Sequence, residues 1–264
     1  MGAQQEHPEQ REAAEMPFLD HLEELRWRIL KSLSALVVGV GAAFFVITQF
    51  DVIGVLERPI TPYLHGAKLV YTHPGDPFQI TLTAAVALGV VIALPVIVYQ
   101  IWAFLAPALY THEKKLVIPV IFGAIALFLA GVSLSFFVVL PLAVSWLMSF
   151  QTASLTPMIT ASEYFDFAVS MSLAFGLCFE LPIVILALAA LGIVTPQLLN
   201  KFRRHAIVAC VIIGAFLTPG DLVWTTIAMA VPLYFLYELS VALSYVIYRR
   251  RQRRARAAEA EVVA

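Results

Sequence analysis

Residues 17–50 read PFLDHLEELRWRILKSLSALVVGVGAAFFVITQF, and this stretch decides the fold. It opens with a charged segment in which Asp20, Glu23 and Glu24 fall within five positions. It continues as an apolar run over 29–50, which is long enough to cross a bilayer core of about 30 Å. A carboxylate is costly inside lipid, so we expect these acids to lie at the edge of a membrane.

The composition of the whole chain extends this interpretation. Of the 264 residues 61% are hydrophobic and 13% are charged, and the mean hydropathy is +0.86. Soluble domains have only about 45–50% apolar residues. We therefore expect an all-α integral membrane protein with six transmembrane helices and no soluble domain. The expected spans are 29–50, 78–104, 116–148, 162–191, 202–217 and 222–248.

The charges predict how these spans are oriented. An even number of crossings places both termini on one side, and 15 of the 17 Lys and Arg residues flank that side. The positive-inside rule then makes both termini cytoplasmic. The chain divides into a disordered acidic N-terminus (1–15), a single transmembrane domain (16–248) and a basic cytoplasmic tail (249–264). No transit peptide is evident, which favours a bacterial cytoplasmic membrane.

The expected spans differ in length. The run 116–150 would be about 50 Å long as a helix, so it must tilt, bend at Pro141 or project from the membrane. The apolar part of the fifth span, 206–217, would reach only about 18 Å. Long helices beside a short hairpin predict a concave, open bundle. Prolines inside several spans predict fixed bends, with moving hinges as the alternative.

The charged opening has a second pattern. Its apolar residues Phe18, Leu22, Leu25 and Ile29 share one helix face, which predicts a helix lying in the membrane interface before it turns into the first span. Arg28 is one turn from Glu24, so the two side chains can pair. Glu23 and Asp20 are more simply part of a solvated face. Glu24 is nearest the membrane and is suited to bind a guanidinium.

Two further carboxylates stand out. Glu113 lies between His112 and Lys114 in the short loop after the second span. It either offers a second acceptor on the cytoplasmic face or only neutralises the lysines. Glu180 lies inside the fourth span, where an ionised carboxylate costs about 2.5–3.5 kcal/mol. We expect it to face other helices, water or a partner, and with Pro182 it marks a polar pocket.

Several kinds of chemistry find no support in the sequence. There is no P-loop, no H-E-x-x-H and no pair of residues at metal-ligand spacing, so we expect no enzyme activity, no metal and no cofactor. Any work must therefore draw on an ion gradient or on another subunit. The tail RRRQRRAR suits an anchor to anionic membrane lipids better than a nucleic-acid site.

Five motifs in order resemble the TatC family, the multi-spanning receptor subunit of the twin-arginine protein translocase. They are HLEELRWRIL, LPVIVYQIWAFLAPALYTHEKKL, FFVVLPLA, AFGLCFELPIV and LTPGD. The resemblance covers about 18–248. It implies a glove-like bundle of six helices and a function in Sec-independent translocation of folded proteins, driven by the proton-motive force. One departure is Thr225, where many relatives have glutamine, which puts a partner contact there in doubt.

The resemblance also implies roles for individual residues. Twin-arginine signal peptides of folded cargo would bind at the cytoplasmic face, and Glu180 would contact single-span TatA- and TatB-type subunits in a multimeric complex. Pro59 and Asp221 match positions on the periplasmic side. The alternative from the residues alone is a proton-coupled secondary transporter that uses Glu180. The residues implied in signal-peptide binding are Glu24, Arg26, Glu113, Phe104, Pro95 and Tyr110.

Overall fold

A computed structural model describes residues 8–64, 68–105, 117–149, 158–190, 192–217 and 224–263. These residues are almost entirely helical, and the only bridge between extended segments among them joins Val70 to Thr160. The elements are α1 (Pro8–Gln49), α2 (Val52–Glu57), a 3-10 turn (Thr61–Tyr63), α3 (Asp76–Leu105), α4 (Val117–Leu134), a π-helical turn (Ser135–Val139), α5 (Leu140–Ser149), α6 (Ala161–Phe179), α7 (Leu181–Ala190), α8 (Pro196–Leu217) and α9 (Trp224–Val263).

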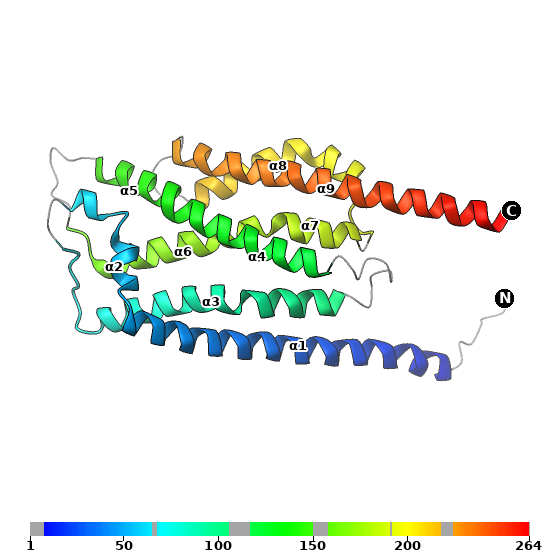
Figure 1. Cartoon of the computed structure of the whole chain (residues 1–264), viewed down its shortest axis with the longest axis horizontal. Helices are drawn as coiled ribbons and strands as arrows, with labels where there is room; N and C mark the ends of the chain where they lie inside the picture. Colours follow the sequence, from blue (N-terminus) through cyan, green and yellow to red (C-terminus); the bar gives the residue numbers. More distant parts are fainter. Residues whose placement is uncertain are drawn as a thin grey trace.

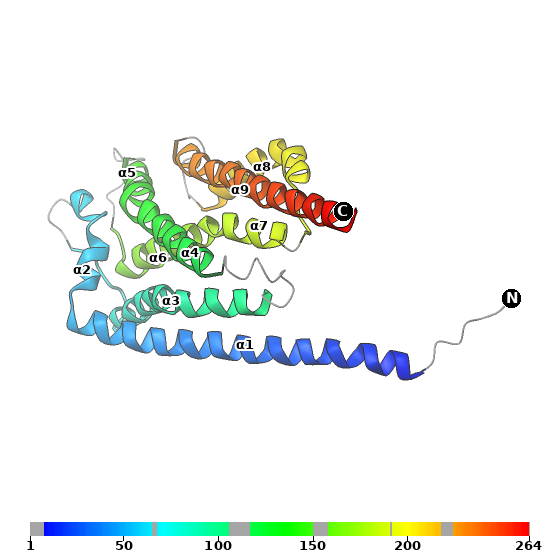
Figure 2. The same cartoon turned by 45° about the vertical axis from the view of Figure 1, so that its right-hand side comes forward.

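The long helices run side by side along the long axis of the molecule (Figures 1 and 2). Helix α1 packs along α3 at one side of the bundle, and α8 packs on α9 at the other. Between them, α4 packs on α6, and α7 contacts α9. Helix α1 begins and α9 ends at the same end of the bundle.

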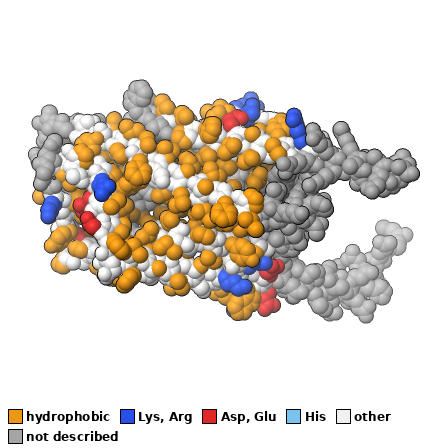
Figure 3. Space-filling view, viewed as in Figure 1, with side chains coloured by type: hydrophobic (Ala, Val, Ile, Leu, Met, Phe, Trp, Pro, Cys, Tyr) orange, Lys and Arg blue, Asp and Glu red, His pale blue; other side chains and the backbone are white. Residues whose placement is uncertain are grey.

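The surface of the bundle is apolar along its middle. Large hydrophobic side chains are exposed on several helices, including Val38, Phe122, Phe137 and Phe216. On the face shown in Figure 3, charged side chains gather towards the two ends of the bundle. Five helical stretches are long and apolar enough to cross a membrane. They are Leu22–Gln49, Asp76–Phe104, Ile118–Ser149, Ala161–Ala189 and Met229–Val246.

The expected span 202–217 is not among these five stretches. It lies in α8, whose first half carries Lys201, Arg203 and Arg204 and leaves only a short apolar part. Helix α8 packs against α9 along its length. Six crossings therefore stay a prediction, while the all-helical membrane architecture is confirmed.

The expectation for the charged opening is wrong in one respect. Helix α1 runs unbroken for 42 residues, so no turn separates an interfacial helix from the first span. The physical reason is that 18–38 contains neither Gly nor Pro, and nothing in that stretch interrupts the helical hydrogen bonds. The helix begins at Pro8, within the stretch 1–15 that was expected to be disordered.

Two helices are interrupted next to a proline. The π-helical turn Ser135–Val139 precedes Pro141, which has no N–H to bond the carbonyl of Phe137. The second interruption is at Glu180, which separates α6 from α7 two residues before Pro182. The carbonyl of Glu180 accepts from the N–H groups of Ile183 and Val184, both at 3.0 Å, so the chain resumes a helix at once.

Glycines allow the neighbouring helices to approach closely. A Cβ on Gly89 of α3 would lie 2.7 Å from the backbone of Val40 in α1, and a Cβ on Gly39 would lie 2.7 Å from the carbonyl oxygen of Gly89. The same holds between α4 and α6, where a Cβ on Gly131 would lie 2.8 Å from the carbonyl oxygen of Phe175. Small residues at such crossings are typical of membrane helices.

We predict that Gly89→Ala separates α1 from α3 and lowers the free energy of unfolding by about 1–3 kcal/mol, the usual cost of overpacking. Thermal unfolding in detergent measures this. Gly41→Ala is the matched control, because a Cβ at Gly41 meets nothing within 4 Å. Equal melting temperatures for the two variants would contradict the close approach.

Candidate functional site

The carboxylate of Glu24 binds a guanidinium. Arg28, one turn along α1, donates to Glu24 Oε1 from Nε at 3.1 Å and from Nη2 at 2.5 Å. The pairing expected from the sequence is therefore confirmed. Arg28 also extends Nη1 towards Oε1 of Gln100 on α3, at 3.5 Å. The Glu24 side chain is 37% exposed and the Arg28 side chain 21% exposed, so the pair lies at the surface of the bundle.

The register of α1 against α3 places more of the predicted residues. Gly39 faces Gly89, and eleven residues nearer the start of α1, Arg28 faces Gln100 eleven residues further along α3. The same antiparallel register brings Glu24 level with Phe104, which is partly buried. The two residues thus lie at the same end of the bundle.

The other residues predicted for this face do not all lie level with Glu24. Arg26 is exposed, two positions from Glu24 on α1. Pro95 is also exposed but lies nine residues before Phe104 in α3, about 14 Å along the helix, so it is not level with Glu24. Tyr110 and Glu113 lie outside the described residues.

Glu180 occupies the junction between α6 and α7. Its Oε1 is buried and, among the described residues, has no hydrogen-bond partner. Leu177, Leu181 and Val184 are 70%, 39% and 51% exposed. They are three before, one after and four after Glu180, a spacing that puts them on the same side of the helix. The carboxyl group therefore lies under an exposed apolar stripe.

The end of the bundle where α1 ends is built from short elements. Asp51 Oδ1 accepts from the N–H of Gly54 at 3.1 Å and so caps α2. The hydroxyl of Tyr164 in α6 donates to the carbonyl of Leu56 at 2.8 Å, which ties α2 to α6. Pro59, three residues after Leu56, is buried. Asp221 lies outside the described residues.

An interhelical cluster between α8 and α9 was missed by sequence reasoning. Arg203 donates from Nη2 to Oε2 of Glu238, and the hydroxyl of Tyr234 donates to Oε1, both at 2.7 Å. Tyr234 and Glu238 are four residues apart, so that contact was visible in the sequence. The partner Arg203 is 35 residues away and follows only from the packing of α8 on α9.

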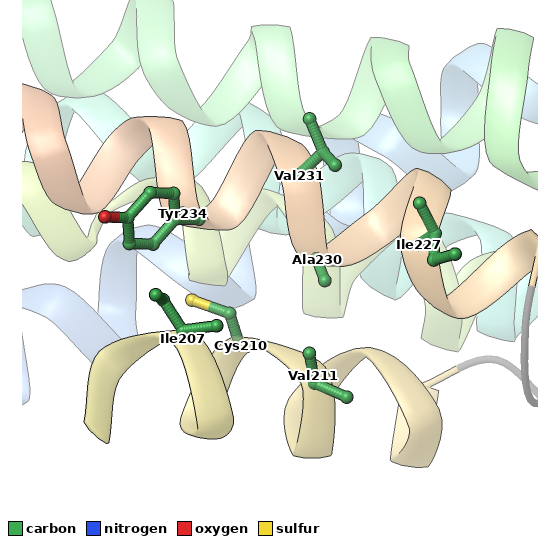
Figure 4. A pocket seen from close by; sticks show the side chains of 7 residues that line it. All are labelled: Ile207, Cys210, Val211, Ile227, Ala230, Val231 and Tyr234. Carbon is green, nitrogen blue, oxygen red and sulfur yellow. The ribbon is translucent and has the colours of Figure 1, made fainter. Parts of the chain in front are cut away.

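An apolar groove runs beside this cluster. Its volume is about 300 Å³, and Figure 4 shows side chains from α8 and α9 facing each other across it. Ile227 and Val231 are half exposed or more, so the groove opens at the surface. Its lining is apolar except for the thiol of Cys210 and the hydroxyl of Tyr234, which donates to Glu238. The lining residues are Ile207, Cys210, Val211, Ile227, Ala230, Val231 and Tyr234.

The described residues do not assemble a metal site, because no three His, Cys, Asp or Glu side chains among them lie close enough to hold an ion. Cys178 and Cys210 are free thiols.

The sequence matches the family described as TatC, Sec-independent protein translocase protein, over residues 20–232. It is 38% identical over 239 residues to the Sec-independent protein translocase protein TatC of Aquifex aeolicus (strain VF5), covering 90% of this chain and 98% of the relative. It is 36% identical over 246 residues to TatCy of Bacillus subtilis (strain 168), covering 90% and 92%.

Two solved structures are similar to this one. A crystal structure of the twin arginine translocase receptor TatC aligns with a TM-score of 0.73 at 38% identity, covering 86% of this chain and 98% of that chain. A second, in DDM, aligns with a TM-score of 0.74 at 39% identity, covering 85% and 99%. At 38% and 39% identity, these two structures are similar to the chain in sequence as well as in fold.

We predict that Glu180→Met raises the free energy of unfolding of the isolated protein by about 1 kcal/mol or more, because it removes a buried acceptor that lacks a bond in the described chain. Thermal unfolding in detergent measures the effect. Glu163→Gln, at an exposed carboxylate on α6, should leave stability within about 0.5 kcal/mol. A lower stability of Glu180→Met would show that the carboxyl is bonded within the folded protein.

Proposed function

The chain belongs to the TatC family of Sec-independent protein translocases, and we propose from this that its Glu24 and Glu113 bind the two arginines of twin-arginine signal peptides. Members of this family are membrane components of the twin-arginine translocase, a transport system. Protein translocation is therefore the function of the family to which this chain belongs. The identity of the ligand and the residues that bind it are the parts we propose.

One observation carries the proposal: Glu24 already holds a guanidinium, that of Arg28, at the end of the bundle where α1 begins. A carboxylate in this position has the geometry to hold an arginine of a cargo protein. Charge-assisted bonds of this kind contribute about 1.5–3 kcal/mol each. A second carboxylate, Glu113, would take the second arginine, with Arg26, Pro95, Phe104 and Tyr110 shaping the surrounding surface.

Arginine rather than lysine is the expected ligand. The guanidinium is planar and presents its donors as a rigid fork that matches both oxygens of a carboxylate. Lysine carries the same charge as a point on a flexible stem, so it binds one oxygen at a time. Two such sites side by side would therefore discriminate a pair of arginines from a pair of lysines.

We propose that both termini face the cytoplasm of a bacterial cell, where folded cargo arrives, with 16–248 as the membrane domain and 249–264 as a basic tail. The support is the charge distribution, since 15 of 17 Lys and Arg residues flank one side of the expected spans. Helix α1 begins and α9 ends at one end of the bundle, consistent with an even number of crossings.

Glu180 is the proposed contact for the single-span TatA- and TatB-type subunits. Its buried Oε1 needs a donor, and the exposed stripe of Leu177, Leu181 and Val184 offers a surface for a second transmembrane helix. A partner helix that brings a polar side chain would satisfy the carboxyl group and bury the stripe together. Assembly would then use the proton-motive force to move cargo. A proton-coupled transporter of small solutes is disfavoured, because the relatives are translocase components.

In this proposal, recognition of cargo depends on the charge of Glu24. Glu24→Gln should weaken binding of a twin-arginine signal peptide by about tenfold, because it removes the charge of the acceptor. Fluorescence titration of labelled peptide into protein in nanodiscs measures this. Glu23→Gln is the matched control, since Glu23 is an adjacent exposed carboxylate. If both variants lose affinity equally, a diffuse negative surface binds the peptide and the proposed site is wrong.

In this proposal, assembly with the single-span subunits depends on the carboxyl group of Glu180. Glu180→Met should reduce recovery of co-expressed single-span subunits about tenfold while leaving signal-peptide binding within twofold of wild type, because the two sites are separate. Co-purification in mild detergent, compared with Glu163→Gln, measures recovery. Normal recovery with Glu180→Met would rule out the carboxyl as the contact.

A further inference from the structure

The acceptor Glu24 is occupied by a residue of its own helix. Both donors of Arg28, Nε and Nη2, end on the same oxygen, Oε1. Arg28 therefore does not form the fork in which a guanidinium bonds the two oxygens of a carboxylate, the arrangement that gives such pairs their geometric specificity. An arginine that approaches from outside needs Oε1 for that fork, so it competes with Arg28 for this oxygen.

Arg28 is more enclosed than its partner. Its side chain is 21% exposed, against 37% for Glu24, and its third donor, Nη1, points to Gln100 of α3. The contact of 3.5 Å is long for a hydrogen bond. Because a guanidinium stays charged at any physiological pH, Arg28 leaves Glu24 only for water or for another acceptor. Gln100 provides the oxygen to which Arg28 can turn.

We propose that Arg28 is a resident guanidinium that an incoming cation must displace from Oε1 of Glu24, and that the displaced Arg28 then bonds to Gln100. The proposal rests on the proposed function, since it assumes that Glu24 binds arginine of a signal peptide. It adds that the unliganded site is closed by the protein itself. Arg28 and Gln100 are then positioning residues that set affinity without touching the ligand.

Competition of this kind has a defined effect on affinity. The apparent dissociation constant of any ligand is raised by the inverse of the fraction of protein in which Glu24 is open. The factor is the same for an arginine pair and for a lysine pair, so their ratio does not change. The higher apparent dissociation constant leaves weak ligands largely unbound, while a twin-arginine peptide, which binds more tightly, still occupies the site.

The experiment is a titration of twin-arginine and twin-lysine signal peptides into the full-length protein in nanodiscs. Arg28→Gln removes the competitor, and both peptides should bind about three- to sixfold more tightly with an unchanged ratio. Lys31→Gln is the matched control, because it removes the same charge one turn further along α1. Its effect should stay below about twofold; equal gains for the two variants would mean long-range charge alone and would overturn the proposal.

Arg28→Lys keeps the charge and tests the fork of donors, in case Arg28→Gln disturbs folding. It should give a smaller gain than Arg28→Gln for both peptides, since one ammonium replaces two donors of the guanidinium. A loss of affinity in either folded variant would show that Arg28 orients Glu24 for its ligand and would overturn the proposal.

Gln100 provides an independent arm. Gln100→Leu removes the acceptor to which the displaced Arg28 bonds, so both peptides should bind about two- to fivefold more weakly. In the Arg28→Gln background the same change should have no effect, because no guanidinium remains at position 28 to bond with residue 100. An undiminished effect in that background would assign Gln100 to direct peptide contact instead. If wild-type protein shows no preference for arginine over lysine, the proposed function itself fails, which is a different result from any of these.

Discussion

The contact between Gly39 and Gly89 is the constraint on which the position of Glu24 and Arg28 depends. A Cβ at Gly89 would meet the backbone of Val40 at 2.7 Å, so α1 and α3 have one register in which they approach closely. That register sets Arg28 opposite Gln100 and Glu24 level with Phe104. The geometry of a charged surface group thus originates in an apolar contact about 22 Å away along the helix.

The sequence predicted the helical membrane architecture well, because the thickness of the bilayer sets the length of an apolar run that can cross it. It was wrong for the charged opening, which was expected to turn at the membrane, because 18–38 contains no helix breaker and α1 continues. At Pro141 a bend was one of the options, and the structure places a π-helical turn next to this residue. The choice between such deformations depends on neighbouring helices.

The candidate site divides in the same way. The pair of Glu24 and Arg28 was predictable because its partners are one helical turn apart, and Glu180 stood out because an acid inside an apolar run is costly. Gln100 was not predictable, since its contact with Arg28 crosses between helices that are 72 residues apart in sequence at that point. The ion pair of Arg203 with Glu238 required the packing of α8 on α9 for the same reason.

The two ends of α1 are held differently. At its C-terminal end the chain is fixed through the cap of α2 by Asp51 and the bond from Tyr164 to Leu56. At its N-terminal end the helix extends beyond the level of Leu105, the last residue of α3. The glycine crossing lies between these two ends. A tilt of α1 by about 5° at this crossing would move Glu24 by about 2 Å, so a small change at one apolar contact would produce a larger displacement of a charged group.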